Sequence, residues 1–138
     1  MVPKLFLDTN ILLDFFFDRA PFSEGAAMLF ELRDNQKIDF FLSTLSLANL
    51  AYHCQRVKKN PVPIIDVLIK VATIVELDEN HFISVNHSKF MDYEDGLQYF
   101  SALEIRNIEA IITRNKKDFK LSTIPIFTPE EFMDTLTQ

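Results

Sequence analysis

The sequence predicts an α/β fold in the form of a three-layer α/β/α sandwich around a mainly parallel sheet. Short apolar runs recur along the chain, and helical patterns separate them. Strands that alternate with helices in this way favour parallel pairing, with helices covering both faces of the sheet. The chain has 138 residues, of which 48% are hydrophobic, and this is enough for one domain with a buried core. We therefore expect residues 1–138 to form a single domain.

Each element of this fold has a local sequence signal. Apolar runs predict five strands, at residues 4–8, 39–43, 73–77, 109–113 and 125–127. A helical pattern directly follows Asp8, and Pro21 suits the first turn of a second helix. Further helices are predicted at residues 46–58, 62–72, 80–89 and 95–106. A last helix begins at Thr128, which is a favourable cap and is followed by a proline and two acids.

Composition excludes several classes of protein. Gly25 and Gly96 are the only glycines, so the chain lacks the glycine-rich loops that cradle phosphates, and no nucleotide cofactor is expected. Cys54 is the only cysteine, which excludes an internal disulfide and a cysteine zinc site. No run approaches the ~20 apolar residues of a membrane span, and the N-terminus lacks the order of a signal peptide. We expect a cytoplasmic protein that does not contact membranes.

The charge balance argues against a broad basic surface for nucleic acid, because the net charge is −6. Two basic runs, at residues 56–59 and 114–117, stand out against this acidic background. Such runs are most often solvated surface. Local contacts with phosphates are the alternative interpretation.

Carboxylates gather around the ends of the predicted strands. Asp8 ends the first apolar run, the cluster of Asp92, Glu94 and Asp95 opens the helix before the fourth strand, and Asp118 follows that strand. In a parallel sheet, ligand sites form at the carboxyl ends of the strands, so we expect these acids to converge. Converging carboxylates repel one another, and a cation would neutralise them. Oxygen ligands suit Mg²⁺ or Mn²⁺, and such a site predicts metal-dependent phosphodiester hydrolysis.

Each of these residues also has an ordinary structural interpretation. Asp95 could only cap a helix, and Asp118 could be a turn acid. Asp8 is the hardest to explain in this way, because the run before it is so apolar. Asp14 and Asp18 fit a solvated helix face better than a site.

Four segments resemble the motifs of the PIN domain family, which includes many metal-dependent ribonucleases and the VapC-type toxins of bacterial toxin–antitoxin pairs. Residues 7–14, Leu-Asp-Thr-Asn-Ile-Leu-Leu-Asp, resemble the first motif. Residues 92–98 resemble the third, acidic segment, and residues 112–119 resemble the fourth. The ending at residues 127–132 is also similar. The resemblance covers the whole chain, with the motifs in the expected order.

This resemblance implies an α/β/α sandwich with the strand order 3-2-1-4-5. It also implies RNA as the substrate, Mg²⁺ or Mn²⁺ as the cofactor, an antitoxin protein as a partner and commonly a homodimer. The implied catalytic and metal-binding carboxylates are Asp8, Asp95 and Asp118. Further implied roles are metal binding by Glu94 and polar support by Asn10, Asn115 and Asp92.

One position departs from the family pattern. The second motif of active PIN nucleases usually offers Glu on the helix after the second strand, and here residues 46–50 offer Asn49. A subgroup of the family whose third motif is Asp-Tyr/Phe-Glu-Asp resembles this chain in carrying Asn at that position. This resemblance implies that Asn49 is a supporting polar residue. By itself it could equally be a polar residue on a helix surface. Asn adds no charge, so metal binding is expected to be weaker unless Glu94 restores it.

Three functions compete on this evidence. The first is a metal-dependent endoribonuclease, the toxin of a toxin–antitoxin pair, in which Arg114, Lys116 and Lys117 hold RNA phosphates. The second is a PIN-like module that has lost catalysis and binds RNA or protein. The third is a receiver domain or a haloacid-dehalogenase-like phosphatase. Its motifs fail, because Asn10 stands where the phosphatase needs a second Asp and residues 1–7 contain no acid for a receiver.

Three consecutive aromatic residues, Phe15, Phe16 and Phe17, have two interpretations. One helix cannot bury all three on a single face. They could form an apolar surface for a dimer partner or another protein. Alternatively, flanking helices could cover them.

Overall fold

The computed structural model describes residues 1–137 and places five strands in one sheet. The strands are β1 (Lys4–Leu7), β2 (Asp39–Ser43), β3 (Ala72–Val75), β4 (Ala110–Ile112) and β5 (Ile126–Phe127). Every neighbouring pair is parallel, and the order across the sheet is β3-β2-β1-β4-β5. The predicted fold class and strand order are confirmed.

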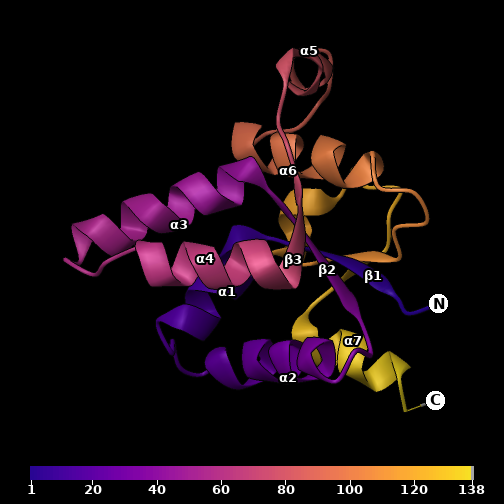
Figure 1. Cartoon of the computed structure of the whole chain (residues 1–138). Coiled ribbons are helices and arrows are strands. Elements are labelled where there is room, and N and C mark those ends of the chain that lie inside the picture. The colour runs from indigo at the N-terminus through magenta and orange to yellow at the C-terminus, as the bar shows by residue number, and fades with distance from the viewer. Residues whose placement is uncertain (138) are drawn as a thin grey trace.

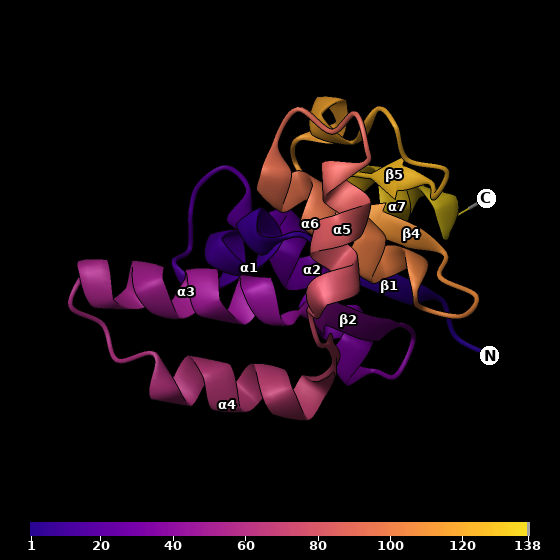
Figure 2. The ribbon, with the colours of Figure 1, turned by 90° about the horizontal axis from the view of Figure 1, so that it is seen from above.

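Helices connect the strands and cover both faces of the sheet. They are α1 (Thr9–Phe16), α2 (Ser23–Asp34), α3 (Thr44–Arg56), α4 (Val62–Val71), α5 (Glu79–Asn86), α6 (Tyr93–Leu103), the 3₁₀ helix η1 (Lys116–Phe119) and α7 (Pro129–Thr135). Figure 1 shows α2 and α7 together on one face and α6 on the other. Seen from above, α3 and α4 run side by side away from the sheet (Figure 2). No helix in the described part of the chain is long and apolar enough to cross a bilayer.

Side chains that alternate along β1 divide the core into two layers. Leu5 and Leu7 belong to the cluster that packs under α2 and α7. Phe6, which lies between them, belongs to the cluster under α6. All three side chains are fully buried. A strand buried on both faces is apolar at successive positions rather than at alternate ones, which explains the apolar run that leads to Asp8.

All five strands end at the same edge of the sheet because they are parallel. Asp8 directly follows β1, Thr44 begins α3 directly after β2, and Thr113 directly follows β4. The Asp8 side chain also caps α1, since it accepts a hydrogen bond from the backbone N–H of Thr9. The strand ends and the starts of the helices therefore bring segments far apart in the sequence to one edge.

Element boundaries differ from the predicted ones by up to three residues. The helix predicted from residue 46 begins at Thr44, because the Ser43 side chain accepts the backbone N–H of Ser46 as its cap. The helix expected to start at Pro21 begins two residues later, at Ser23. Such ends depend on cap geometry, which apolar periodicity does not report.

Phe15, Phe16 and Phe17 are half-buried under neighbouring helices. Phe15 stacks on Phe30 of α2, with ring centroids 3.9 Å apart and an angle of 7° between the planes. Phe17 meets His53 of α3 edge-on, with centroids 4.7 Å apart. Flanking helices therefore cover these rings in part, and an apolar surface for a partner stays a prediction.

Candidate active site

One pocket at the carboxyl edge of the sheet collects polar side chains from distant parts of the sequence. It has a volume of about 290 Å³. Its carboxylates belong to Asp8, Asp92, Glu94, Asp95 and Asp118. Its amides belong to Asn10, Asn49, Gln98 and Asn115. Every acid and amide with a predicted catalytic, metal-binding or supporting role therefore lines the same pocket, although the roles themselves stay predictions.

Asp8 lies at the buried end of this pocket and is 7% exposed. Its Oδ1 accepts a hydrogen bond from the backbone N–H of Thr9 at 2.8 Å. Its Oδ2 accepts one from the Thr113 hydroxyl at 2.8 Å and one from Asn10 Nδ2 at 3.3 Å. The Gln98 side chain donates to Oδ1 at 3.4 Å. Donors from α1, α6 and the residue after β4 thus fix the orientation of a carboxylate that burial makes costly to ionise.

The acids of the pocket lie close enough to repel one another. Burial raises the pKa of Asp8, and the charge of Asp118 raises it further against the hydrogen bonds that stabilise the ionised form. The pKa of Asp95 is raised to about 7, first by burial and then by the charges of Asp8, Asp92, Asp118 and Glu94. The predicted convergence of these acids is seen in their common lining of one pocket. A cation here would lower both pKa values.

Gln98 connects the elements that surround Asp8. It lies on α6, three residues after Asp95, and is 2% exposed. Its Nε2 donates to the Ser46 hydroxyl at 2.7 Å, and its Oε1 accepts from the Ser43 hydroxyl at 2.5 Å. These bonds tie α6, which carries the acidic segment, to the end of β2 and the start of α3. The position of Asp95 relative to Asp8 therefore depends on this amide.

Asp92 caps α6, so the interpretation of Asp95 as the cap is wrong. The Asp92 side chain accepts a hydrogen bond from the backbone N–H of Asp95 at 3.0 Å. Asp95 occupies the first turn of the helix and lines the pocket. Asp118 reaches the same pocket from η1, where it is exposed.

Asn49 and Glu94 meet at the rim of the pocket. Asn49 Nδ2, from α3, donates a hydrogen bond to Glu94 Oε1, from α6, at 2.9 Å. A Glu at position 49 would place two carboxylates side by side, which raises the cost of ionising both. The departure from the family pattern therefore lowers the negative charge of the site and gives Glu94 a partner.

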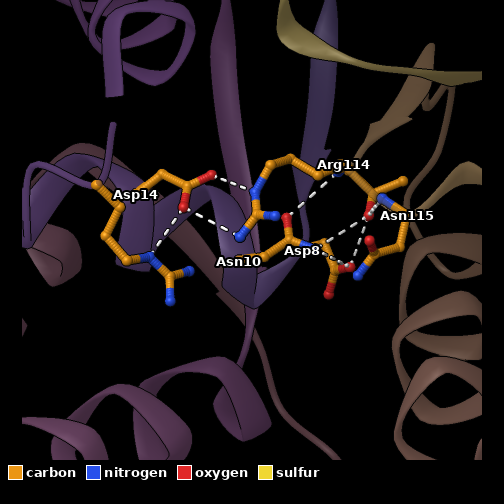
Figure 3. A network of polar contacts seen from close by, with 7 residues as sticks. Asp8, Asn10, Asp14, Arg114 and Asn115 are labelled. Carbon is orange, nitrogen blue, oxygen red and sulfur yellow. Dashed lines mark hydrogen bonds and ion pairs between the residues drawn. The ribbon is translucent and has the colours of Figure 1, made fainter. Parts of the chain in front are cut away.

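The prediction that Asp14 lies on a solvated helix face is wrong, because this residue is only 1% exposed. Its Oδ2 accepts from Arg114 Nε at 2.6 Å, and its Oδ1 accepts from Arg114 Nη2 at 3.2 Å and from Arg19 Nε at 3.0 Å. Figure 3 shows this pair beside Asn10, whose Oδ1 accepts the backbone N–H of Arg114. The Phe22 ring packs on the Arg114 guanidinium, 4.0 Å from its centroid. Asp18 is exposed, as predicted.

The three residues predicted to contact phosphate, Arg114, Lys116 and Lys117, differ in their ion pairs. Arg114 binds Asp14 and does not line the acid pocket, and its contact with phosphate stays a prediction. Lys116 pairs with Glu131 at 3.0 Å. A hydrogen bond from the Thr128 backbone, helped by Lys116, lowers the pKa of Glu131. Lys117, in contrast, has no ion pair within residues 1–137.

The oxygen atoms of the pocket are of the type that Mg²⁺ and Mn²⁺ prefer as ligands, but they are not arranged as a complete coordination shell. Within the described residues, no three His, Cys, Asp or Glu side chains stand so that they could together hold one metal ion. The oxygens of the pocket are nevertheless the ligands these ions prefer, and both ions retain several waters. A bound cation would offset the repulsion between neighbouring acids that helps to raise the pKa of Asp8 and of Asp95. Asp118 is exposed, and exposed side chains change rotamer readily.

Sequence reasoning missed Gln98 and Thr113, which contact Asp8 directly. A signal existed for each. Gln98 lies three residues after Asp95, so the two share a helix face. Thr113 is the first polar residue after an apolar strand, at the same edge as Asp8. Neither signal names Asp8 as the partner, because that pairing depends on the strand order.

The family is decided by a match between the chain and a family model. The model described as a PIN domain matches residues 4–117. The chain belongs to the PIN domain family. The predicted resemblance is confirmed, and the acid pocket is built by the segments on which it rested. Among curated proteins, none matches the chain.

Solved structures similar to this PIN domain share its fold. One is the crystal structure of VapBC2 from Rickettsia felis bound to a DNA fragment from its promoter, with a TM-score of 0.64 and 19% identity over 90% of this chain and 96% of that one. Another is a toxin–antitoxin complex from Klebsiella pneumoniae, with a TM-score of 0.65 and 19% identity over 91% of this chain and 97% of that one. At this identity the likeness concerns the fold.

Proposed function

We propose that this PIN domain is a metal-dependent endoribonuclease that hydrolyses RNA phosphodiester bonds. The observation that supports this most directly is the pocket in which carboxylates from the end of β1, the start of α6 and η1 converge. Membership of the PIN family supports the same assignment, because the resemblance to that family implies metal-dependent ribonuclease activity. Carboxylates that raise one another's pKa at the edge of a sheet are typical of a functional site rather than of a structural ion pair.

In this proposal Asp8, Asp95 and Asp118 hold Mg²⁺ or Mn²⁺, with Glu94 beside them. The bound ion would supply an activated water and neutralise charge on the phosphoryl group. The chain's own residues orient the ligands. Thr113, Asn10 and Gln98 fix the Asp8 carboxylate. Asp95 and Asp118 would help to orient the attacking water.

We also propose that the protein is the toxin of a toxin–antitoxin pair, with an antitoxin protein as its partner. One similar structure is described as a toxin–antitoxin complex and the other as VapBC2, and this chain covers nearly the whole of each matched chain. Action in the cytoplasm and a homodimer belong to the same proposal, since both follow from the resemblance to VapC-type toxins.

A second candidate function is a PIN module with weak or lost catalysis that binds RNA or a protein. The bond between Asn49 and Glu94 favours it, because an amide occupies the position where active relatives carry a carboxylate. The two candidates differ in a single property, which is metal-dependent turnover of RNA.

Cleavage of a structured RNA mixture by the purified full chain decides between them. We expect cleavage with Mg²⁺ or Mn²⁺, none with EDTA, and a loss of at least about 100-fold in Asp8→Asn, since a buried ligand charge is removed without a change of shape. The matched control is Asp39→Asn, an exposed acid at the opposite end of β2. Equal cleavage by wild type and Asp8→Asn would reject the assignment. Absence of cleavage in every variant would favour the binding module.

A further inference from the structure

Beside the acid pocket lies a second hollow with a different chemistry. It has a volume of about 340 Å³ and shares Asp92 and Asp118 with the acid pocket. Its cationic side chains are Lys89, Lys117 and Lys120, and its apolar ones are Phe90, Met91 and Leu121. This lysine hollow is formed by the loop between α5 and α6 together with η1 and the residues after it.

The three cations of the lysine hollow are exposed and available to a ligand. No ion pair in the part of the chain that is described engages Lys89, Lys117 or Lys120. The basic residues close by in the sequence differ in this respect, because Arg114 pairs with Asp14 and Lys116 with Glu131. The cationic surface next to the acid pocket is therefore formed by Lys89 and Lys120 together with Lys117.

The apolar wall of the lysine hollow is open to solvent and supported from behind. Met91 is fully exposed, and Leu121 is 49% exposed. The Phe90 ring packs against Tyr99 and Phe100, with centroids 5.2 Å and 6.1 Å away. An apolar surface framed by lysines matches a nucleotide, whose base contacts apolar side chains while its phosphates meet the cations.

The loop that carries Lys120 and Leu121 is attached to α6. The Tyr99 hydroxyl lies 3.1 Å from the Thr123 hydroxyl and accepts the Thr123 backbone N–H at 3.3 Å. The Ser122 hydroxyl donates to the carbonyl of Ile124 at 2.7 Å. These bonds hold the lysine hollow and the acidic start of α6 in a fixed relation.

The charge of the molecule explains why an acidic nuclease would need cations beside its acid pocket. The chain carries a net charge of −6, and five carboxylates line the acid pocket, so an approaching phosphate backbone is repelled. Screening limits such effects to about 8 Å at physiological salt, and only cations next to the pocket can offset them. The lysine hollow meets this condition, because Asp92 and Asp118 line both the hollow and the acid pocket.

We propose that the lysine hollow binds the nucleotide adjacent to the cleaved phosphate in single-stranded RNA. This inference rests on the proposed endoribonuclease function and assigns to it a substrate subsite. Single-stranded RNA is the occupant because its bases can leave the stack and lie on the apolar wall, whereas duplex RNA keeps them paired. The volume of the hollow falls at the lower end of the range for small-ligand sites, which suits one nucleotide.

The test measures RNA binding separately from cleavage. A fluorescein-labelled single-stranded RNA of about eight nucleotides is titrated with the full chain carrying Asp8→Asn over a range of salt concentrations. We expect Lys89→Ala/Lys120→Ala in this background to weaken binding at least about tenfold and to reduce the salt slope by about one to two. The charge-matched control is Lys37→Ala/Lys70→Ala, which removes two exposed lysines that line neither pocket. Thermal melts establish that all variants fold.

Three outcomes would overturn the inference. Equal weakening by the two lysine pairs would show only a general charge effect. Absence of RNA binding in every variant would exclude the subsite, while cleavage by the wild-type chain tests the proposed function independently. Lysine-dependent binding of a poly-glutamate peptide in place of RNA would assign the hollow to an acidic protein partner.

Discussion

At the scale of single residues, the site consists of carboxylates held in position at a cost to stability. Four donors orient Asp8 in a buried position. Asp95 is surrounded by other acids, which with burial raise its pKa to about 7. A bound cation would offset this cost, because it would neutralise carboxylates that burial and mutual repulsion make costly to ionise.

Asp95→Asn should therefore stabilise the metal-free protein. The pKa of Asp95 rises from 3.8 to about 7 on folding, so the folded state binds more protons between these values and stability falls as pH rises through this window. We expect the variant to gain about 1–2 kcal/mol at pH 8, allowing for solvent screening of a half-buried group, and almost nothing near pH 4. Urea unfolding in EDTA measures this. A gain that is equal at both pH values would contradict the account.

Asn49→Glu should tighten metal binding and weaken the metal-free fold. The new carboxylate replaces a donor to Glu94, so it adds a ligand charge and a repulsion at the same position. We expect Mn²⁺ affinity to rise about fivefold to tenfold, which corresponds to about 1 kcal/mol of additional attraction. Calorimetric titration gives the affinity, and Asn49→Gln is the uncharged control. Equal affinities in the two variants would count against a metal near Glu94.

At the scale of elements, the Asp14–Arg114 pair fastens α1 to the loop between β4 and η1. That loop carries Thr113 and Asn115, and its backbone is further held by Asn10. The bidentate contact of Arg114 with a buried carboxylate is geometrically specific. Since η1 follows directly, the same fastening positions the short helix whose Asp118 lines the acid pocket.

Removing one member of this pair should be costly. Asp14→Ala leaves Arg114 and Arg19 without their partner, and we expect a loss of about 3 kcal/mol of unfolding free energy. The double variant Asp14→Leu/Arg114→Met should lose less, because Arg114 no longer leaves an unpaired charge and the remaining Arg19 side chain is 35% exposed to solvent. Urea denaturation of both variants tests this. A double variant less stable than Asp14→Ala would contradict the role of the ion pair as a fastening.

The sequence alone predicted the elements because their signals are local. The apolar run at residues 4–8 and the cap at Thr128 depend on neighbours within a few positions. The burial of Asp14 could not be predicted in the same way. Its partner Arg114 lies 100 residues later, and an isolated Asp on a helix otherwise reads as solvated.

The candidate site could be predicted from the sequence only in part. Asp8, Asp95 and Asp118 could be placed in one pocket, because a parallel sheet brings strand ends to one edge. The contacts that orient them, from Gln98 and Thr113, required the strand order and the crossing of α6 over β2. The same limit applied to the basic residues. The sequence did not show that Arg114 and Lys116 form ion pairs, whereas their neighbour Lys117 forms none within the described residues.

At the scale of the whole molecule, the fold places opposite charges side by side at one edge of the sheet. The acid pocket and the lysine hollow share Asp92 and Asp118, so a metal and a nucleic acid could be held by adjoining surfaces. The remaining surface is acidic overall, given the net charge of −6, and does not favour nonspecific binding of nucleic acid.

A divalent ion should therefore stabilise the folded chain as a whole. Because the ion binds the converged carboxylates and not the unfolded chain, we expect about 2–3 kcal/mol of added stability at 100 times the dissociation constant. Thermal melts with and without Mn²⁺ measure the shift, and Asp8→Asn should abolish most of it. A shift retained in Asp8→Asn would place the ion elsewhere.

The most direct test of the central claim is anomalous diffraction from a crystal of the full chain soaked in Mn²⁺. The account predicts a manganese peak in the acid pocket, bounded by the carboxylates of Asp8, Asp95 and Asp118. A manganese peak elsewhere with this pocket vacant, or a pocket whose three carboxylates remain apart at saturating Mn²⁺, would contradict it.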